Sequence, residues 1–450
     1  MSTAKIISYN LHGEAVCAGA ARISTTKGSA LEIFEHEEPP EKNRALIGKV
    51  LASGHKSLLE HAVFTLALEN VSVFVEEFFI ECRLASFTVK SRRYVDFGAS
   101  GYYIPETLEG AALARYRDYM ERLFSAYRSL LELGAPKEDA RFLLPYSFHS
   151  NFYCTVNARE LARMINGMLS ERCRGIPELR ALASQLVSQL EELFPAMLSE
   201  FDQAALRAPA EEFSPAPAGE AEEAPRFFDR AEAGIVELLA CPADAPGLLR
   251  EARRFGGEAE EIDYRALFRA ERPRELEMLP YTFAVRGVTL AAVTHLVRHR
   301  MQSIIVPPIR TMSCGRMIVP PSIRADEKLM ACYRDAAEAA FALRRELMRD
   351  PELKKYPHYY ALSGNLTDVL ITMNARELLH FIRLRSCTRA QWEVRGVTLR
   401  LLSQLRESFP ELFCCAGPSC YVYGRCPEGR LSCGRAEEIA GQLASGELLL

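Results

Sequence analysis

The sequence lacks long apolar runs, a strong charge of one sign and paired Cys-x-x-Cys motifs, and each absence narrows the possible function. No apolar run approaches membrane-spanning length and no basic-then-apolar leader begins the chain, so we expect neither a membrane protein nor a secreted one. The formal net charge of −4 gives no reason to expect general affinity for nucleic acid or membrane surfaces. The thirteen cysteines are an odd number and eight are scattered, which favours reduced thiols in the cytoplasm.

The sequence does contain an internal repeat. The pentapeptide Asn-Ala-Arg-Glu-Leu occurs at 157–161 and again at 374–378, an offset of 217 residues (374 − 157). The same offset aligns Phe64 with Tyr281, so the two segments match without a gap. One register over about a hundred residues predicts a fused duplication of a single folding unit. A chain of 450 residues has room for two or three domains with sizeable cores.

Composition divides the chain into four parts. The first half is predicted to span 1–206 and the second 226–413. Residues 207–225 are rich in Ala, Pro and Glu with little to bury, so we interpret them as a linker. A cysteine-rich tail follows at 414–450.

Periodicity predicts the same order of elements in both halves. A short strand is predicted over Lys5–Tyr9, and β-rich apolar runs over Val63–Leu68 and Thr282–Val285. Helical spacing of apolar residues predicts helices in matching pairs. The first pair covers 71–83 and 288–300, and a long amphipathic pair lies near 113–130 and 327–348. A third pair begins with the Asn-Ala-Arg-Glu-Leu motif, and a closing pair ends at Phe-Pro. The predicted class is α+β and dominated by helices.

Arginines concentrate in the second half. Arg-His-Arg at 298–300 ends an apolar helix, where positive charge also suits the negative end of the helix dipole, so capping alone is one interpretation. Four further arginines lie with the only tryptophan, Trp392, within 374–393. These four are Arg376, Arg383, Arg385 and Arg389. Guanidinium groups at this density bind phosphates or planar imide groups through paired hydrogen bonds.

Together these motifs resemble the flavin-dependent thymidylate synthase family, whose signature is Arg-His-Arg, seven residues and then Ser. The resemblance extends over nearly the whole chain, once in each half. In the first half it is carried by Gly54–His61 with Val63–Thr65, Arg83–Phe87, Ser91–Tyr94, Asp139–Pro145 and Thr155–Arg159. In the second half it is carried by Arg298–Arg300, Asn374–Arg376, Leu384–Arg385 and Ala390–Glu393. It implies two tandem copies of that fold, each helix-rich with a small, mostly antiparallel sheet.

Each half departs from the family pattern at different positions. The first half has Glu81-Cys82-Arg83 at the Arg-His-Arg site and Met168 in place of the late arginine. The second half has Pro308 in place of the signature serine and His358 in place of the mid-chain arginine, Arg141. Because the family's sites combine residues from two subunits, the resemblance implies one composite site between the halves. Random decay of both copies is the alternative.

The resemblance implies reductive methylation of dUMP to dTMP, with methylenetetrahydrofolate as carbon donor and FAD reduced by NADPH. A fixed guanidinium can stabilise negative charge on a pyrimidine ring, and Arg385 is the catalytic candidate. The substrate-binding candidates are Ser91, Arg93, Arg141, His295 and Arg298. The cofactor-binding candidates are His55, Ser57, Asn157, Arg159, Arg298, His299, Arg300, Asn374 and Arg376. A homodimer would reproduce the family's assembly of four fold units.

Two questions remain open from the sequence. The tail thiols of Cys415, Cys420, Cys426 and Cys433 could hold a structural zinc, an iron–sulfur centre or no metal. The function could also be non-catalytic flavin or nucleotide binding, or chemistry on another pyrimidine nucleotide. The last alternative rests on Val89, which replaces an acidic residue of the family pattern, and on Pro308.

Overall fold

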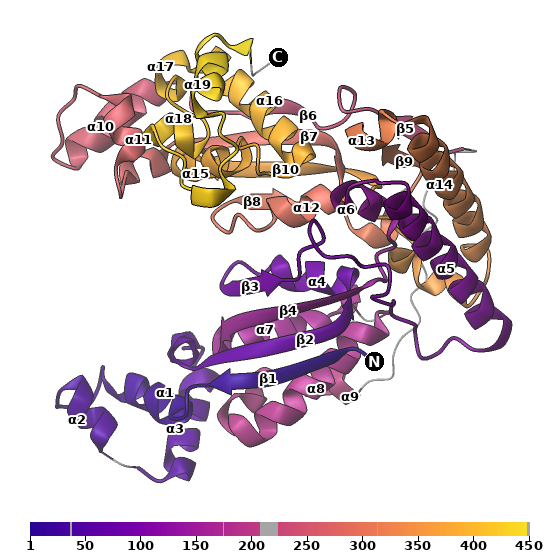
Figure 1. Ribbon diagram of the computed structural model, residues 1–450. Helices are drawn as coiled ribbons and strands as arrows, with labels where there is room; N and C mark the ends of the chain where they lie inside the picture. Colours follow the sequence, from indigo (N-terminus) through magenta and orange to yellow (C-terminus); the bar gives the residue numbers. More distant parts are fainter. Residues whose placement is uncertain (37, 174, 208–223, 313, 448–450) are drawn as a thin grey trace. The chain divides into compact units, whose positions relative to one another are not determined.

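The computed structural model describes residues 1–36, 38–173, 175–207, 224–312 and 314–447 (Figure 1). The chain forms two compact units. Unit 1 holds Met1–Glu132, the described part of Leu143–Ala218, and Ala339–Ala361. Unit 2 holds Leu133–Phe142, the described part of Gly219–Glu338, and the described part of Leu362–Leu450. Most of the predicted linker, 207–225, lies outside the described residues.

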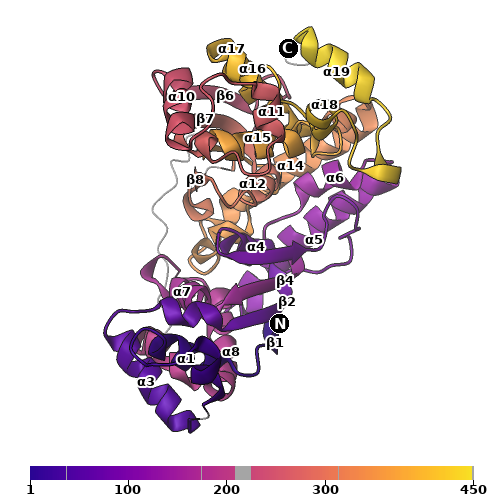
Figure 2. The ribbon, with the colours of Figure 1, turned by 90° about the vertical axis from the view of Figure 1, so that its left-hand side faces the viewer.

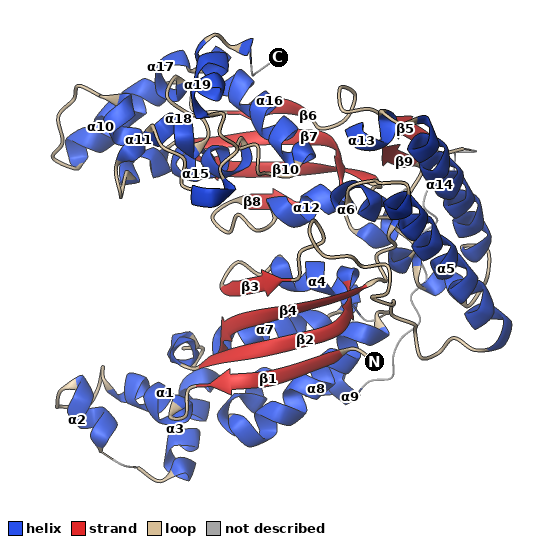
Figure 3. Cartoon of the chain, viewed as in Figure 1, coloured by secondary structure: helices blue, strands red, loops and turns tan. Residues whose placement is uncertain are grey.

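Each unit contains a four-stranded antiparallel sheet (Figure 3). In unit 1 the order is β1 (Thr3–Tyr9), β2 (Val63–Ser72), β4 (His149–Asn157), β3 (Ala85–Val89). In unit 2 the order is β6 (Ile235–Ala240), β7 (Pro280–Thr289), β10 (Leu366–Asn374), β8 (Ser303–Ile305). A separate parallel pair joins β5 (Arg226–Phe228) to β9 (Arg316–Ile318). The α+β class and the two copies of one fold are confirmed.

The two copies agree down to individual hydrogen bonds. Strand β2 pairs with β4, and β7 with β10, in registers that coincide at the 217-residue offset. The hydroxyls of Thr65 and Thr155 lie 3.1 Å apart on the first pair, and those of Thr282 and Thr372 lie 2.9 Å apart on the second. The duplication therefore preserves strand register as well as helix order.

The predicted helix pairs are present in the structure. The long pair is α5 (Gly110–Glu132) and α14 (Glu327–Leu347), and the closing pair is α8 (Pro177–Leu193) and α16 (Trp392–Ser408). The Asn-Ala-Arg-Glu-Leu pair is α7 (Ala158–Leu169) and α15 (Ala375–Arg385). The described residues also form the helices α1 (Gly13–Arg22), α2 (Ala30–Glu35), α3 (Pro40–Ala52), α6 (Lys137–Ala140), α9 (Gln203–Arg207), α10 (Ala245–Phe255), α11 (Tyr264–Arg269), α13 (Pro321–Arg324), α17 (Pro410–Phe413), α18 (Ser419–Tyr423) and α19 (Ala436–Ala444).

The predicted helices over 71–83 and 288–300 are too long. They are α4 (Val73–Ile80) and α12 (Leu290–Leu296). Each begins where a hydroxyl, from Ser72 or Thr289, accepts a backbone N–H of the first turn and so fixes the N-terminus. Residues 298–300 form a turn after α12 instead of continuing it, because the amide of His299 bonds to the carbonyl three residues back.

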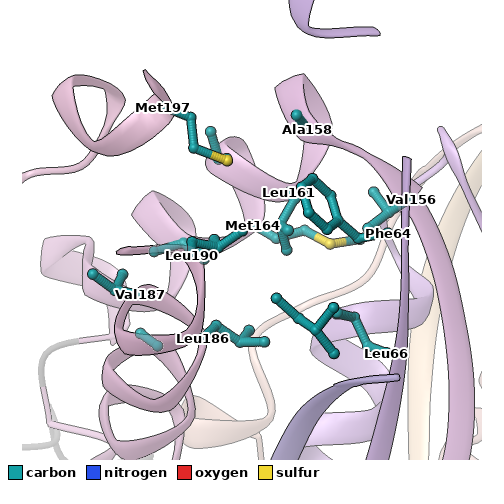
Figure 4. Close-up of a cluster of buried hydrophobic side chains, with 14 of the residues drawn as sticks. Phe64, Leu66, Val156, Ala158, Leu161, Met164, Leu186, Val187, Leu190 and Met197 are labelled. Carbon is teal, nitrogen blue, oxygen red and sulfur yellow. The ribbon is translucent and has the colours of Figure 1, made fainter. Parts of the chain in front are cut away.

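The core of unit 1 lies between its sheet and the helices α7 and α8 (Figure 4). Phe64 and Leu66 of β2 meet Leu161 of α7 and Leu186 of α8, and all four side chains are buried. Truncating one such leucine to alanine costs about 2–5 kcal/mol of unfolding free energy. Helices α1 and α3 pack side by side in the same unit (Figures 1 and 2). Among the described residues, no helix is both long and apolar enough to cross a membrane.

The units differ from the sequence halves by two exchanged segments. Residues Leu133–Phe142 of the first half belong to unit 2, and Ala339–Ala361 of the second half belong to unit 1. The first of these segments packs tightly against Gly364 of unit 2. The Gly364 amide donates to the Phe142 carbonyl, and a Cβ added at Gly364 would lie 2.9 Å from the Phe142 Cβ. The exchange carries Arg141 into unit 2 and its counterpart, His358, into unit 1.

Candidate active site

The centre of the site in unit 2 is Arg385, the last residue of α15. Its Nε donates to Nε2 of His299 at 2.9 Å, and its Nη2 donates to the carbonyl of His295 at 3.3 Å. Nδ1 of His299 lies 3.2 Å from Oε1 of Glu377. The structure therefore brings together the ends of α12 and α15, which are 89 residues apart in sequence (385 − 296).

The environment of His299 favours its neutral form. The ring is 5% exposed and packs edge-on against Phe381, with centroids 4.8 Å apart. Burial lowers the pKa of His299, Glu377 opposes that shift, and the positive charge of Arg385 adds to it. Both ring nitrogens of His299 have protein partners in the structure, Glu377 at Nδ1 and Arg385 at Nε2.

The exchanged segment places Arg141 in the same unit. Arg141 is 2% exposed, and its Nε donates to the carbonyl of Glu138. The segment is fixed by Asp139, which accepts a hydrogen bond of 2.8 Å from Nε1 of Trp392 and another from the Ser322 hydroxyl. Burial raises the pKa of Asp139, and these two donors oppose the shift.

A buried carboxylate supports this part of the site. Glu393, beside Trp392 on α16, accepts hydrogen bonds from the Thr289 amide at 2.7 Å and the Thr289 hydroxyl at 2.6 Å. Burial raises its pKa to about 7, while Thr289 and the charge of Arg141 oppose the shift. Unit 1 has the equivalent arrangement, in which Glu178 accepts from Ser72 and from Tyr359.

The other candidates of unit 2 surround this centre. Arg298 and Arg300 are exposed on the turn after α12, and His295 lies in the last turn of that helix. Asn374 caps α15 by accepting the Glu377 amide at 2.9 Å. Arg376 forms an ion pair with Glu277.

The first-half candidates Ser91 and Arg93 lie on a loop of unit 1 that follows β3. The Arg93 amide donates to the Ser91 hydroxyl at 3.3 Å, and its guanidinium lies over the ring of Tyr94, 5.4 Å from the centroid. Between them, buried Arg92 forms an ion pair with Glu76 of α4, which is fully buried. This ion pair anchors the loop and so fixes the backbone on either side of Arg92.

The remaining unit 1 candidates repeat structural roles seen in unit 2. Asn157 caps α7 as Asn374 caps α15. Arg159 pairs with Glu60, which is the counterpart of the Arg376–Glu277 ion pair at the 217-residue offset. His55 and Ser57 are exposed before and at the start of a short 3-10 helix, Ser57–His61. These asparagines and arginines therefore stabilise helix starts in both copies, whatever else they bind.

A metal site in the tail is not shown by the structure. Within the described residues, no group of three or more His, Cys, Asp or Glu side chains is arranged to hold a metal ion. All thirteen cysteines lie in those residues as free thiols. Of the four candidates, Cys415 lies in the turn after α17, Cys420 in α18, and Cys426 and Cys433 in the segment between α18 and α19. Within unit 2, Arg269 donates to the carbonyl of Val422 in the tail and Arg406 donates to the carbonyl of Leu443.

Three features of the site were missed by sequence reasoning. They are the contact of His299 with Glu377, the anchoring of the Ser91 loop by Glu76, and the exchange of segments between the halves. For the contact of His299 with Glu377, the only signal in the sequence is that Glu377 follows Asn374 by three residues. The same spacing is typical of a helix start, so it does not point to the histidine.

Comparison with known proteins shows the family to which the chain is similar. The sequence model of the family described as Thymidylate synthase complementing protein (Thy1) matches residues 5–196 and 247–411. A flavin-dependent thymidylate synthase of Geobacter sulfurreducens is 36% identical over 168 residues, which is 36% of this chain and 72% of that protein. The enzyme of the same name from Clostridium tetani is 34% identical over 182 residues, which is 36% of this chain and 73% of that protein.

Among solved structures, the UMP/dUMP methylase PolB from Streptomyces cacaoi, bound with 5-Br dUMP, matches with a TM-score of 0.39 and 23% identity. The match covers 44% of this chain and 94% of PolB. The two regions matched by the family model together take up most of the chain, and one falls in each half. The chain therefore belongs to the thymidylate synthase complementing protein family, whose curated members include the flavin-dependent thymidylate synthases, and it carries the family fold twice.

Proposed function

We propose that the protein is an FAD-dependent thymidylate synthase that methylates dUMP reductively to dTMP, with methylenetetrahydrofolate and NADPH as co-substrates. Its family relatives carry that name, which supports the reaction class. We further propose one composite site whose residues come from both halves of the chain. We assign the protein to the cytoplasm, with two chains as the working assembly, because two chains supply four fold units.

The observation that carries the composite site is the exchange of segments. Arg141 belongs to the first half by sequence but to unit 2 by packing, where Arg385 and Arg298 also lie. The other exchanged segment carries His358 into unit 1. His358 has no guanidinium, and unit 1 has Met168 at the position equivalent to Arg385. Cationic groups are therefore gathered in one unit and missing from the equivalent positions of the other.

Arg385 would act on the pyrimidine ring. Its guanidinium is planar and permanently charged, and its two contacts with His299 and His295 fix its plane. Held beside the ring oxygens and nitrogen, it would stabilise negative charge that develops there and so make the ring carbon nucleophilic. This step uses no cysteine nucleophile.

Ser91, Arg93 and Arg141 would bind the phosphate and sugar end of the nucleotide. Arginine is suited to phosphate because it offers two parallel N–H donors, and Ser91 adds a hydroxyl. The buried Arg92–Glu76 ion pair would hold their loop in place before the substrate arrives.

The residues of unit 2 also fit a flavin dinucleotide. Arg298 and Arg300 are exposed cations on one turn, which suits a pyrophosphate, and Asn374 and Arg376 lie at the start of α15. The bound flavin would supply the hydride for the reduction. The protein's own contribution is to bind and orient the ring system and to exclude water from the reacting carbon.

The test is dTMP formation from dUMP, methylenetetrahydrofolate, FAD and NADPH. We expect Arg385→Ala and Arg93→Ala each to abolish product formation. The control is Met168→Leu, at the position equivalent to Arg385, because Met168 is buried in the core of unit 1 and a charged replacement would disturb folding.

Three outcomes would revise the proposal. Activity that survives Arg93→Ala but is lost in Arg310→Ala would assign the site to the opposite halves. Flavin that NADPH bleaches without dTMP being formed would favour another pyrimidine nucleotide, as Val89 and Pro308 allow. Protein that binds nucleotide but never reduces its flavin would be a non-catalytic homologue.

A further inference from the structure

Three side chains of unit 2 form a linear hydrogen-bonded series from Glu377 through His299 to Arg385. Oε1 of Glu377 lies 3.2 Å from Nδ1 of His299, and Nε2 of His299 lies 2.9 Å from Nε of Arg385. Glu377 is 8% exposed and His299 is 5% exposed, so water does not replace either contact. The series ends on the guanidinium to which the proposed function assigns the chemistry.

The direction of each hydrogen bond in this series follows from Arg385. A guanidinium nitrogen can only donate, so Nε2 of His299 must accept and cannot carry a proton. His299 is then neutral, with its single proton on Nδ1, and that N–H donates to Glu377. A second proton on His299 would set two N–H groups against each other and break the contact with Arg385.

The first half shows the same positions without the series. Glu160, Cys82 and Met168 stand where Glu377, His299 and Arg385 stand in the second half. Glu160 pairs there with Arg163 at 3.2 Å, on its own helix. The glutamate persists in both halves because it follows the capping asparagine, whereas the histidine and the late arginine are absent together. If the histidine serves only to hold the late arginine, we expect both residues to be absent from the same half.

We propose that His299 is a positioning residue that fixes the guanidinium of Arg385 for catalysis and is itself oriented by Glu377. This inference rests on the proposed function for the identity of the reaction, but the hydrogen-bond series is a property of the protein alone. A misplacement of about 1 Å at a reacting group lowers rates roughly 100-fold. Loss of His299 therefore lowers kcat, while the KM for dUMP and the bound flavin change little.

The kinetic test compares His299→Ala with His299→Gln. Alanine removes the acceptor, and we expect kcat to fall by about 10- to 100-fold. Glutamine offers an oxygen near the position of Nε2 and cannot titrate, so it restores most of the rate. Cys82→Ala, at the equivalent position of the first half, is the matched control and leaves kcat unchanged.

The pH profile separates positioning from a purely structural role. The groups that face His299 are Glu377, Arg385 and the ring of His380, whose centroid is 5.8 Å away. Wild-type kcat falls on the acid side as His299 takes up its second proton, and His299→Gln lacks that acid limb. An unchanged acid limb in the glutamine variant overturns the proposal, as does flavin loss in His299→Ala that fully accounts for the lower rate.

A spectroscopic test decides the series without any turnover. In protein labelled with ¹⁵N-histidine, the His299 resonance is assigned as the one missing from His299→Gln. Its long-range ¹H–¹⁵N pattern should show a neutral ring protonated on Nδ1, and it should shift in Arg385→Ala. A ring protonated on Nε2 refutes the series. Wild-type protein that makes no dTMP but shows the expected pattern refutes the proposed function and leaves the series established.

Discussion

Replacing Glu393 with glutamine should make the stability of unit 2 less sensitive to pH. Glu393 is buried on α16, and burial raises its pKa to about 7 from the ordinary value of 4.5 for a glutamate. Between these two values, the folded protein keeps a proton that the unfolded chain has released. Rising pH therefore favours unfolding, and the stability that is present below pH 4.5 is lost progressively up to pH 7.

The size of the effect follows from the two pKa values. Each pKa unit is worth about 1.4 kcal/mol, so proton linkage between pH 5 and pH 8 amounts to roughly 2.5 kcal/mol for this single group. Glutamine cannot titrate, yet its amide can accept from the Thr289 N–H and donate to the Thr289 hydroxyl, so packing is kept. Relative to Glu393→Gln, the wild type should thus lose about 2.5 kcal/mol of unfolding free energy over this range.

The assay is urea unfolding at several pH values, followed by tryptophan fluorescence. Trp392 is the only tryptophan and neighbours Glu393, so the signal reports on unit 2. Glu407→Gln, which removes an exposed carboxylate from the same helix, is the control and should differ from wild type by a constant amount. A pH-independent difference for Glu393→Gln would show that Thr289 and Arg141 keep the carboxylate charged, and the reasoning from burial would be wrong.

Three further substitutions or modifications test individual contacts. Asn374→Ala should lower the unfolding free energy by about 1 kcal/mol through loss of the helix cap, whereas Asn374→Asp should not; equal losses in urea titrations would contradict the capping role. Cys433 and Cys414 are both exposed residues, but their thiols differ in pKa. A hydrogen bond from Thr388 lowers the pKa of Cys433. Partial burial of the Cys414 sulfur raises the pKa of Cys414 to about 11. Cys433 should therefore be alkylated faster by iodoacetamide at pH 7.5, as peptide mass spectrometry can show, and the reverse order would refute this. Tyr359→Phe removes a 2.9 Å donor to buried Glu178 and should cost about 1–3 kcal/mol of unfolding free energy, measured by urea unfolding with far-UV circular dichroism because both residues lie in unit 1; a neutral result would mean that the remaining donors suffice.

The repeat shows how far sequence reasoning can go here. The 217-residue offset predicted two copies of one fold, and the structure confirms them with the same strand order and even equivalent threonine pairs. The central strands β4 and β10 were not predicted, although they pair with β2 and β7. In both, every second residue is buried, but polar Ser150 and Thr367 are among the buried residues, and apolar Tyr153 and Leu370 stand at positions that are not buried, which hides the strand period in the sequence.

The cysteine tail shows the opposite limit. Cysteine spacing alone left a structural zinc, an iron–sulfur centre or no metal open, because four thiols on glycine-containing loops can reach a common point. Whether they do depends on what else holds the loops. In the structure the tail is fixed by Arg406, whose guanidinium donates to the carbonyls of Cys414 and Ala416. Backbone contacts of this kind leave no trace in the spacing of the cysteines.

The sequence by itself determined the duplication, the family and the residue types that differ between the two copies, because these are properties of the order of residues. Only the tertiary structure decided which residues act together. Arg141 joins unit 2, where its segment packs through Asp139 and Trp392, and the partners of Arg385 lie 86 and 90 residues earlier in the chain. Packing and hydrogen bonding between distant segments set those pairings, and neither is encoded in local periodicity or spacing.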